Sequence, residues 1–155
     1  MIVVRPMAAE YLEAVLSLEV ATPEAPHWGR VAYERVLSAD SKTAGRRAAW
    51  VALDGHELQG FAAAHLIVDV CELELIVVAE SARRQGIGTI LLDAVMTWAL
   101  ASGARKLDLE VRAGNESAIC FYLKAGMLRE GLRRGYYRNP EEDAILMGKS
   151  LYSGD

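Results

Sequence analysis

The chain has 155 residues, of which 52% are hydrophobic and 25% are charged, and its formal net charge at pH 7 is −4. This composition excludes a disordered chain, and the acidic balance argues against a protein that binds nucleic acid mainly through a basic surface. No internal repeat, low-complexity tract or linker divides the sequence. We therefore expect one domain over residues 1–155.

Two features of the sequence bear on where the protein resides. It contains two cysteines, Cys71 and Cys120, and its first residues, MIVVRPMAAE, lack the basic and then apolar order of a signal peptide. The longest apolar run, around residues 71–79, is interrupted by glutamates and is shorter than the ~18 residues that a membrane span needs. We expect a cytoplasmic protein that binds neither membrane nor nucleic acid.

Hydrophobic periodicity predicts the elements of the first half. A short strand over residues 2–5 is followed by two helices, residues 8–20 and 31–37, separated by the proline-containing loop TPEAPHWGR. Three strands come next, the first two joined by an Asp54-Gly55 hairpin turn, and we expect them to pair antiparallel. These strands are residues 47–53, 58–70 and 72–78.

The second half continues with alternating elements. Residues 87–100 have helical spacing and end before Gly103, and the sequence KLDLEV alternates as a strand. Asn115 is suited to be the N-cap of a helix that ends near Gly126. Two final strands, residues 128–134 and 144–149, flank the turn region YYRNPEED. The predicted order is β-α-α-β-β-β-α-β-α-β-β.

The stretch RRQGIGTILL opens a predicted helix with Gly86 and Gly88, although glycine costs about 1 kcal/mol in a helix. The first backbone N–H groups of a helix have no partner inside it, and glycines allow an anionic ligand to approach them. The stretch is neither a P-loop nor a complete dinucleotide-binding fingerprint. The residues themselves leave two interpretations open, a pyrophosphate cradle or a tight turn between strand and helix.

Two motifs together resemble a known family. RRQGIG is similar to the R/Q-x-x-G-x-G/A motif that binds acetyl-CoA in the GNAT N-acetyltransferases, and NESAICFYLKAGM resembles the asparagine- and tyrosine-containing helix of the same family. With LEVRAGN and YYRNPEEDAILM, the second half resembles the RimI-type branch, which acetylates the N-terminal alanine of a ribosomal protein. The resemblance covers residues 72–149 by motif and 2–71 by element order only. The proline common after the fourth strand is absent.

The resemblance implies an α+β GNAT fold: a mixed, mostly antiparallel sheet with helices on both faces. It also implies acetyl-CoA as co-substrate, with its pantetheine arm along the fourth strand, its pyrophosphate on the amides that start the glycine-led helix, and an asparagine contact. Asn115 has the alternative role of a simple helix cap. The implied cofactor positions are Ile76, Val77, Val78, Arg83, Arg84, Gln85, Gly86, Ile87, Gly88, Thr89, Asn115, Ala118 and Tyr122.

Acetyl transfer to an amine needs a base for the amine proton and an acid for the leaving thiolate. The resemblance implies Tyr122 as the acid and Glu110 as the base. Without the resemblance, the pattern indicates that Tyr122 is an aromatic residue of the core and that Glu110 is a charged residue exposed to solvent. Glu72 corresponds to the base of the histone-acetylating members, and Glu74 shares its strand face, so both remain alternatives. We interpret Cys120 as a small buried residue and not as a nucleophile.

The family resemblance also places the acceptor site. The loop PHWGR would line it from one side and RRGYYRNPEED from the other, so Trp28, Tyr136, Tyr137 and Glu141 are candidates for a peptide groove, next to Glu72 and Glu74. The alternatives are that Trp28 fills the core under a loop and that the tyrosines pair across a hairpin.

The sequence therefore predicts an N-acetyltransferase that moves acetyl from acetyl-CoA to a primary amine by direct attack in a ternary complex, most simply the N-terminal α-amine of a protein. The alternatives are a small-molecule amine or amino-acid acetyltransferase and a cofactor-binding module without catalysis. We expect no metal requirement, and a monomer or weak homodimer.

Overall fold

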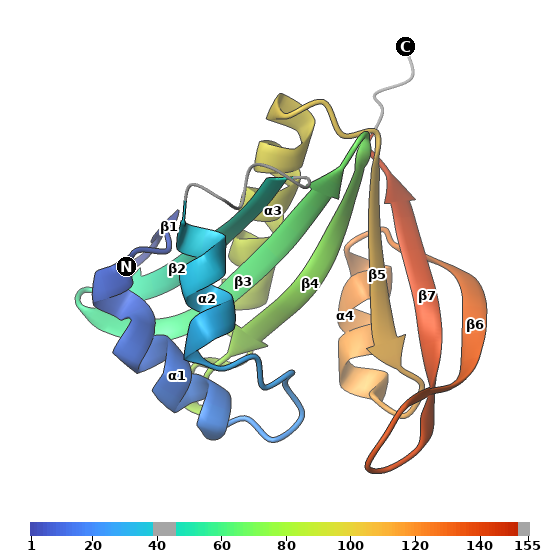
Figure 1. Ribbon diagram of the computed structural model, residues 1–155, viewed down its shortest axis with the longest axis horizontal. Coiled ribbons are helices and arrows are strands. Elements are labelled where there is room, and N and C mark those ends of the chain that lie inside the picture. Colours follow the sequence, from blue (N-terminus) through green and yellow to red (C-terminus); the bar gives the residue numbers. More distant parts are fainter. Residues whose placement is uncertain (39–45, 152–155) are drawn as a thin grey trace.

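The computed structural model describes residues 1–38 and 46–151. A seven-stranded sheet with the order β1-β2-β3-β4-β5-β7-β6 runs through them (Figure 1). Neighbouring strands pair antiparallel, except that β4 and β5 are parallel. The strands are β1 Ile2–Pro6, β2 Arg46–Asp54, β3 Glu57–Ile67, β4 Val70–Val78, β5 Lys106–Arg112, β6 Leu128–Tyr137 and β7 Glu142–Ser150.

Helices cover both faces of the sheet, with α1 and α2 on one face and α3 and α4 on the other (Figure 1). They are α1 Leu12–Val20, α2 Arg30–Leu37, α3 Ile87–Ala101 and α4 Glu116–Lys124. Because successive side chains of a strand point to opposite faces, one strand serves both cores. Trp50 and Ala52 of β2 pack towards α3, while Val51 and Leu53 pack towards α1 and α2.

An irregularity in the pairing of β3 with β4 changes which face of the sheet the apolar side chains of β4 point to. Ala64 is opposite Leu73 and Ala63 is opposite Leu75, so Glu74 is an extra residue on β4. A bulge of this kind reverses the alternation of side chains beyond it. Leu73 consequently belongs to the core under α3 and α4, whereas Leu75 belongs to the core under α1 and α2.

The predicted element order and the mixed sheet are confirmed, and three boundaries are corrected. The strand predicted over residues 58–70 was wrong at its end, because the chain turns at Val68, whose φ is 56°, and Asp69 before β4 begins. Tyr136 and Tyr137 belong to β6 and not to the following turn. The first helix begins with a 3-10 turn over Ala9–Tyr11.

The described helices are all too short or too polar to cross a membrane.

Candidate functional site

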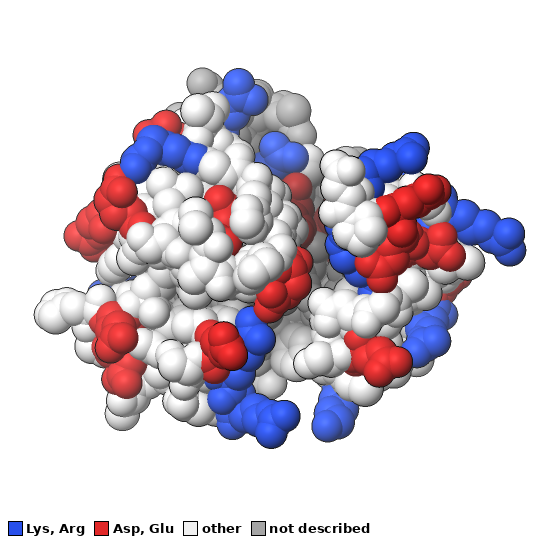
Figure 2. Space-filling model, turned by 90° about the horizontal axis from the view of Figure 1, so that it is seen from below, with Lys and Arg blue, Asp and Glu red and all other residues white. Residues whose placement is uncertain are grey.

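The centre of the sheet opens between β4 and β5. These strands pair only where Val70, Cys71 and Glu72 face Lys106, Leu107 and Asp108. Beyond that join, β4 continues with β3 up to Val78, β5 continues with β7 up to Arg112, and the two strands diverge (Figure 1). Figure 2 shows the molecule from the divergent end, hollowed there, with acidic and basic side chains on both sides.

The divergent half of β4 has backbone groups that face the opening. Ala79 N–H donates to the Gln59 carbonyl of β3 at 2.8 Å. Because alternate residues of an antiparallel ladder direct their backbone groups to opposite sides, Val77 faces β3, and Ile76 and Val78 face the opening. The Val78 carbonyl accepts a hydrogen bond from Arg83 Nε at 3.3 Å. Of the three strand positions predicted to bind cofactor, Ile76 and Val78 have backbone groups directed there.

The chain then turns into α3 through a glycine that the conformation requires. Gly86 is the N-cap of α3 and has a left-handed backbone, with φ 79° and ψ 9°. Glycine adopts this conformation at little cost in free energy because it has no Cβ. A Cβ at this position would meet nothing within 4 Å, so conformation and not space requires the glycine. Arg84, with φ 66°, is also left-handed.

The start of α3 presents unpaired donors. The Ile90 N–H makes the first helical bond, to the Gly86 carbonyl at 3.1 Å. The N–H groups of residues 87–89 precede it and have no acceptor within the helix. Among the described residues, no side chain caps this end. Arg83, Arg84, Gln85, Gly86 and Thr89 are exposed around it, while Ile87 anchors the turn in the core.

Gly88 has a different role from Gly86. A Cβ on Gly88 would lie 3.2 Å from the Phe121 ring of α4, which is closer than an ordinary van der Waals contact. The absence of a side chain thus allows α4 to pack near the first turn of α3.

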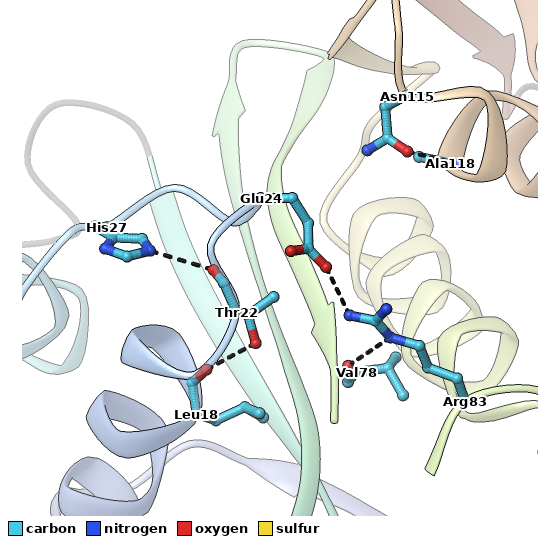
Figure 3. A network of polar contacts seen from close by, with 8 residues as sticks. All are labelled: Leu18, Thr22, Glu24, His27, Val78, Arg83, Asn115 and Ala118. Carbon is cyan, nitrogen blue, oxygen red and sulfur yellow. Dashed lines mark hydrogen bonds and ion pairs between the residues drawn. The ribbon is translucent and has the colours of Figure 1, made fainter. Parts of the chain in front are cut away.

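The candidate residues of α4 lie close to the opening. Asn115 Oδ1 accepts the Ala118 N–H at 3.2 Å, so Asn115 is the helix cap, as predicted. In Figure 3 the amide nitrogen of Asn115 points away from the helix. A single side chain can therefore cap α4 with its oxygen and offer its nitrogen to a ligand. Ala118 is half-buried and packs against the core that also contains Tyr122.

Tyr122 is buried, with 7% of its surface exposed. Burial is the main reason that its pKa is raised above that of an ordinary phenol, and the nearby Tyr137 adds to the shift. The phenol therefore remains protonated throughout the neutral range and can serve as a proton donor.

Glu110 lies on β5, among the half-buried residues that alternate with its core residues. The pKa of the Tyr136 phenol is raised, first by its interaction with the Glu110 carboxylate and then by burial. Arg133 Nε lies 3.6 Å from Glu110 Oε1. Two residues of β6 thus lie next to the predicted base.

Glu72, one of the alternative bases, is electrostatically linked to both Glu74 and Glu110. The pKa of Glu72 is raised, first because the protein removes part of its hydration and then because Glu74 and Glu110 repel its negative charge. Glu74 forms an ion pair with Arg47 Nε at 3.2 Å. Glu72, Glu74 and Glu110 therefore form one acidic group beside the join of β4 and β5.

The loop between α1 and α2 carries Trp28 and is anchored in two places. Glu19 Oε1 accepts the Trp28 N–H at 2.8 Å, and Arg83 donates to Glu24 Oε1 at 2.7 Å. Figure 3 shows Arg83 between Glu24 of this loop and Val78 at the end of β4. Trp28 is half-buried and its ring lies 5.5 Å from that of Tyr33. The loop is thus fastened to the turn that precedes α3.

The tyrosines of β6 stack on arginines. The Arg133 guanidinium lies 5.4 Å from the Tyr136 ring centroid, and that of Arg112 lies 4.3 Å from the Tyr137 centroid. Burial raises the pKa of Tyr137 to about 12, with Glu110 adding to the shift. Tyr136 and Tyr137 are consecutive on β6 and do not pair across the hairpin.

Sequence reasoning missed three contributors: Glu19, Glu24 and Arg133. The sequence did contain a signal for Glu19. Leu12, Val15 and Glu19 stand at i, i+3 and i+7, which places Glu19 on the same helix face as two apolar residues. Nothing in the sequence alone links Glu24 to Arg83 or Arg133 to Glu110, because these contacts depend on how the strands and loops meet.

The prediction that Cys120 is buried was wrong, because the core-facing side of α4 carries Ile119 and Tyr122 and Cys120 projects outwards. Cys71 is the buried cysteine, and burial raises its pKa to about 12. Within residues 1–38 and 46–151 no group of three or more His, Cys, Asp or Glu side chains could hold a metal ion.

Comparison with known proteins agrees with this architecture. The acetyltransferase (GNAT) family matches residues 12–127. The [ribosomal protein bS18]-alanine N-acetyltransferase of Escherichia coli strain K12 is 36% identical over 93 residues, which are 59% of this chain and 63% of that protein. The match thus spans slightly less than two thirds of that relative.

Solved structures extend the likeness to the complete fold. The crystal structure of the Escherichia coli ribosomal-protein-S18-alanine N-acetyltransferase superposes with a TM-score of 0.83 at 25% identity, over 100% of this chain and 97% of that one. Arabidopsis thaliana NAA60 in complex with acetyl-CoA gives a TM-score of 0.82 at 21% identity, over 97% of this chain and 98% of that one. With a family match over most of its length and this fold, the chain belongs to the acetyltransferase (GNAT) family.

Proposed function

We propose that the protein transfers an acetyl group from acetyl-CoA to the N-terminal α-amine of a protein, by direct attack in a ternary complex. The opening between β4 and β5 carries this proposal, since it combines free strand backbone, the unpaired amides of α3, a buried phenol and a glutamate. The similarity to ribosomal-protein alanine acetyltransferases supports the choice of acceptor.

Acetyl-CoA fits the described residues. The backbone of Ile76 and Val78 would pair with the pantetheine arm as a further strand does. The amides at the start of α3 would bind the pyrophosphate, because unpaired N–H groups and the helix dipole both favour an anion. Asn115 would add a hydrogen bond from its amide nitrogen. When bound, acetyl-CoA supplies the thioester carbonyl that the amine attacks.

The chemistry assigns one proton to each of two side chains. The amine nitrogen attacks the thioester carbonyl carbon, an amide bond forms and the carbon–sulfur bond breaks. Glu110 takes the proton from the amine, directly or through one water, and Tyr122 gives its proton to the departing sulfur. The raised pKa of Tyr122 keeps this proton in place at neutral pH until the thiolate forms.

The choice of acceptor follows from the pKa of the amine. An α-amine has a reference pKa near 8 and a lysine side chain one near 10.4, so an N-terminus loses its proton more readily. Glu110, a single half-buried carboxylate, suits that easier deprotonation.

A thiol-release screen tests the proposed acceptor. It should compare peptides with a free N-terminal alanine, the same peptides blocked at the N-terminus but containing lysine, and polyamines. We expect the free N-terminal peptides to have the highest kcat/KM. A tenfold advantage for lysine side chains or polyamines would contradict the acceptor, and the absence of turnover with every amine would contradict catalysis.

A further inference from the structure

A buried carboxylate lies beneath the loop between α1 and α2. Glu19 is 4% exposed, and each of its oxygens accepts hydrogen bonds. Oε1 accepts from the Trp28 N–H at 2.8 Å and from the Tyr33 hydroxyl at 2.6 Å, and Oε2 accepts from the Gly29 N–H at 3.2 Å. Burying a charge is unfavourable unless it is well hydrogen-bonded. The loop and α2 together thus hold Glu19 in position.

Glu19 also compensates for an uncapped helix. Gly29 is the N-cap of α2 and has no side chain with which to cap it. The carboxylate of Glu19, from the last turns of α1, lies at this end and accepts the Gly29 N–H. A negative charge near the first turn of a helix is stabilising. One side chain therefore fixes both the start of α2 and the backbone of Trp28.

We propose that Glu19 is a positioning residue for the acceptor: it holds the loop over residues 21–29 so that Trp28 forms one wall of the acceptor site. This inference rests on the proposed function, because it assigns the loop to acceptor binding. Because Glu19 itself is buried, we assign it no contact with the substrate. Its effect passes through the Trp28 and Gly29 backbone, while the Glu24–Arg83 ion pair holds the same loop against the turn before α3.

The substitution Glu19→Gln tests the proposal at the level of single atoms. If the amide keeps its oxygen where Oε1 accepts from Trp28 and Tyr33, its NH₂ group replaces Oε2 and faces the Gly29 N–H, donor against donor. We expect amide hydrogen exchange at Gly29 to accelerate roughly tenfold, the change expected from losing one hydrogen bond to a charged group. The acceptor KM should rise by about the same factor, while kcat and the acetyl-CoA KM stay within about twofold.

Tyr33→Phe is the matched control. It removes the hydroxyl that donates to Oε1 but leaves both backbone bonds from the loop to Glu19. We expect a lower Tm with little change in Gly29 exchange or in acceptor KM. If Glu19→Gln does not fold, Glu19→Asp retains the charge but shortens the side chain by one methylene, and the same two measurements apply to it.

Three results would overturn the positioning role: unchanged exchange at Gly29, accelerated exchange with an unchanged acceptor KM, or an equal increase in the acetyl-CoA KM. A wild-type chain that turns over no amine would instead contradict the proposed function. In that case the exchange measurement alone decides: acceleration confined to residues 28–29 supports Glu19 as the anchor of the loop, and its absence overturns it.

Discussion

Tyr122 and Glu110 lie in different environments. Tyr122 is enclosed in the core and its pKa is raised chiefly by burial. Glu110 is half-buried on β5, and Arg133 Nε lies 3.6 Å from its carboxylate, on a strand that is not the immediate neighbour of β5 in the sheet. The proposed acid is thus enclosed by the core, and the proposed base lies near polar side chains of β6.

We expect Tyr122→Phe to lower kcat by roughly 100-fold or more while acetyl-CoA affinity changes little, because the ring is kept and the proton is lost. In the wild type, a raised pKa preserves the protonated form to higher pH, so kcat should show no loss below pH ~10 from this group. Single-turnover kinetics and calorimetry measure the two effects. Cys120→Ala is the control and should remain active; near-normal kcat in Tyr122→Phe would eliminate Tyr122 as the acid.

We expect Glu110→Gln to reduce kcat/KM at neutral pH and the defect to shrink towards pH 9. An α-amine is increasingly neutral at that pH and needs less help from a base. Glu72→Gln and Glu74→Gln should have smaller effects. The measurement is a pH profile of kcat/KM for all three variants.

Two outcomes of this profile would reassign the base. A defect in Glu110→Gln that does not vary with pH would indicate that Glu110 positions the amine. A pH-dependent loss in Glu72→Gln alone would move the base to β4, where the raised pKa of Glu72 already makes that carboxylate more basic.

At the scale of elements, the two glycines at the start of α3 are needed for different reasons. One is needed for its backbone conformation and the other for the space that a missing side chain leaves. Gly86 has a left-handed backbone with open surroundings, and Gly88 lies against Phe121. The sequence showed both glycines, but it contained no sign that the second one accommodates α4. That distinction depends on the contact between two helices far apart along the chain.

We expect Gly88→Val to weaken acetyl-CoA binding, because its side chain occupies the first turn of α3 and displaces Phe121. Gly86→Ala is the comparison: it should reduce stability by about 1 kcal/mol through the left-handed backbone. Titration calorimetry and thermal unfolding measure these effects. Unchanged acetyl-CoA affinity in a folded Gly88→Val protein would rule out this end of α3 as the pyrophosphate site.

The element order could be predicted because periodicity and turn residues are local signals. The end of β3 could not, because Val68 and Asp69 sit within an apolar stretch that continues the strand pattern on both sides. The outward position of Cys120 and the buried carboxylate of Glu19 were also missed, since each depends on which face of a helix meets the sheet. The motif positions in 83–89 and 115–122 could be located from the sequence, whereas the partners of Glu110 required the fold.

At the scale of the whole molecule, two parts of the sheet meet over three residue pairs of β4 and β5. The core under α3 and α4 continues across this join, and it contains Leu73 on one side and Leu107 on the other. Hydrophobic packing, more than strand pairing, therefore unites the parts.

We expect Leu107→Ala to destabilise the protein by about 2–5 kcal/mol, the range for removing a large side chain from a core. Leu107 is fully buried at the join. Urea unfolding followed by circular dichroism and tryptophan fluorescence should give one shared transition. Separate transitions in the wild type would show that the parts fold independently and would contradict a core that unites them.

The free edge of β4 has a consequence for aggregation. The unpaired backbone groups of an exposed edge strand can pair with a strand of another chain, and charged residues and prolines on the edge prevent this. The outer edges follow this rule: β1 ends in Arg5 and Pro6, and β6 carries Arg129, Arg133 and Arg134. The divergent half of β4 has the apolar sequence LIVV, yet it lies inside the sheet, shielded by β5 and its partners. An interior edge can thus remain apolar and without a partner strand, open to a narrow ligand and protected from the strands of neighbouring molecules.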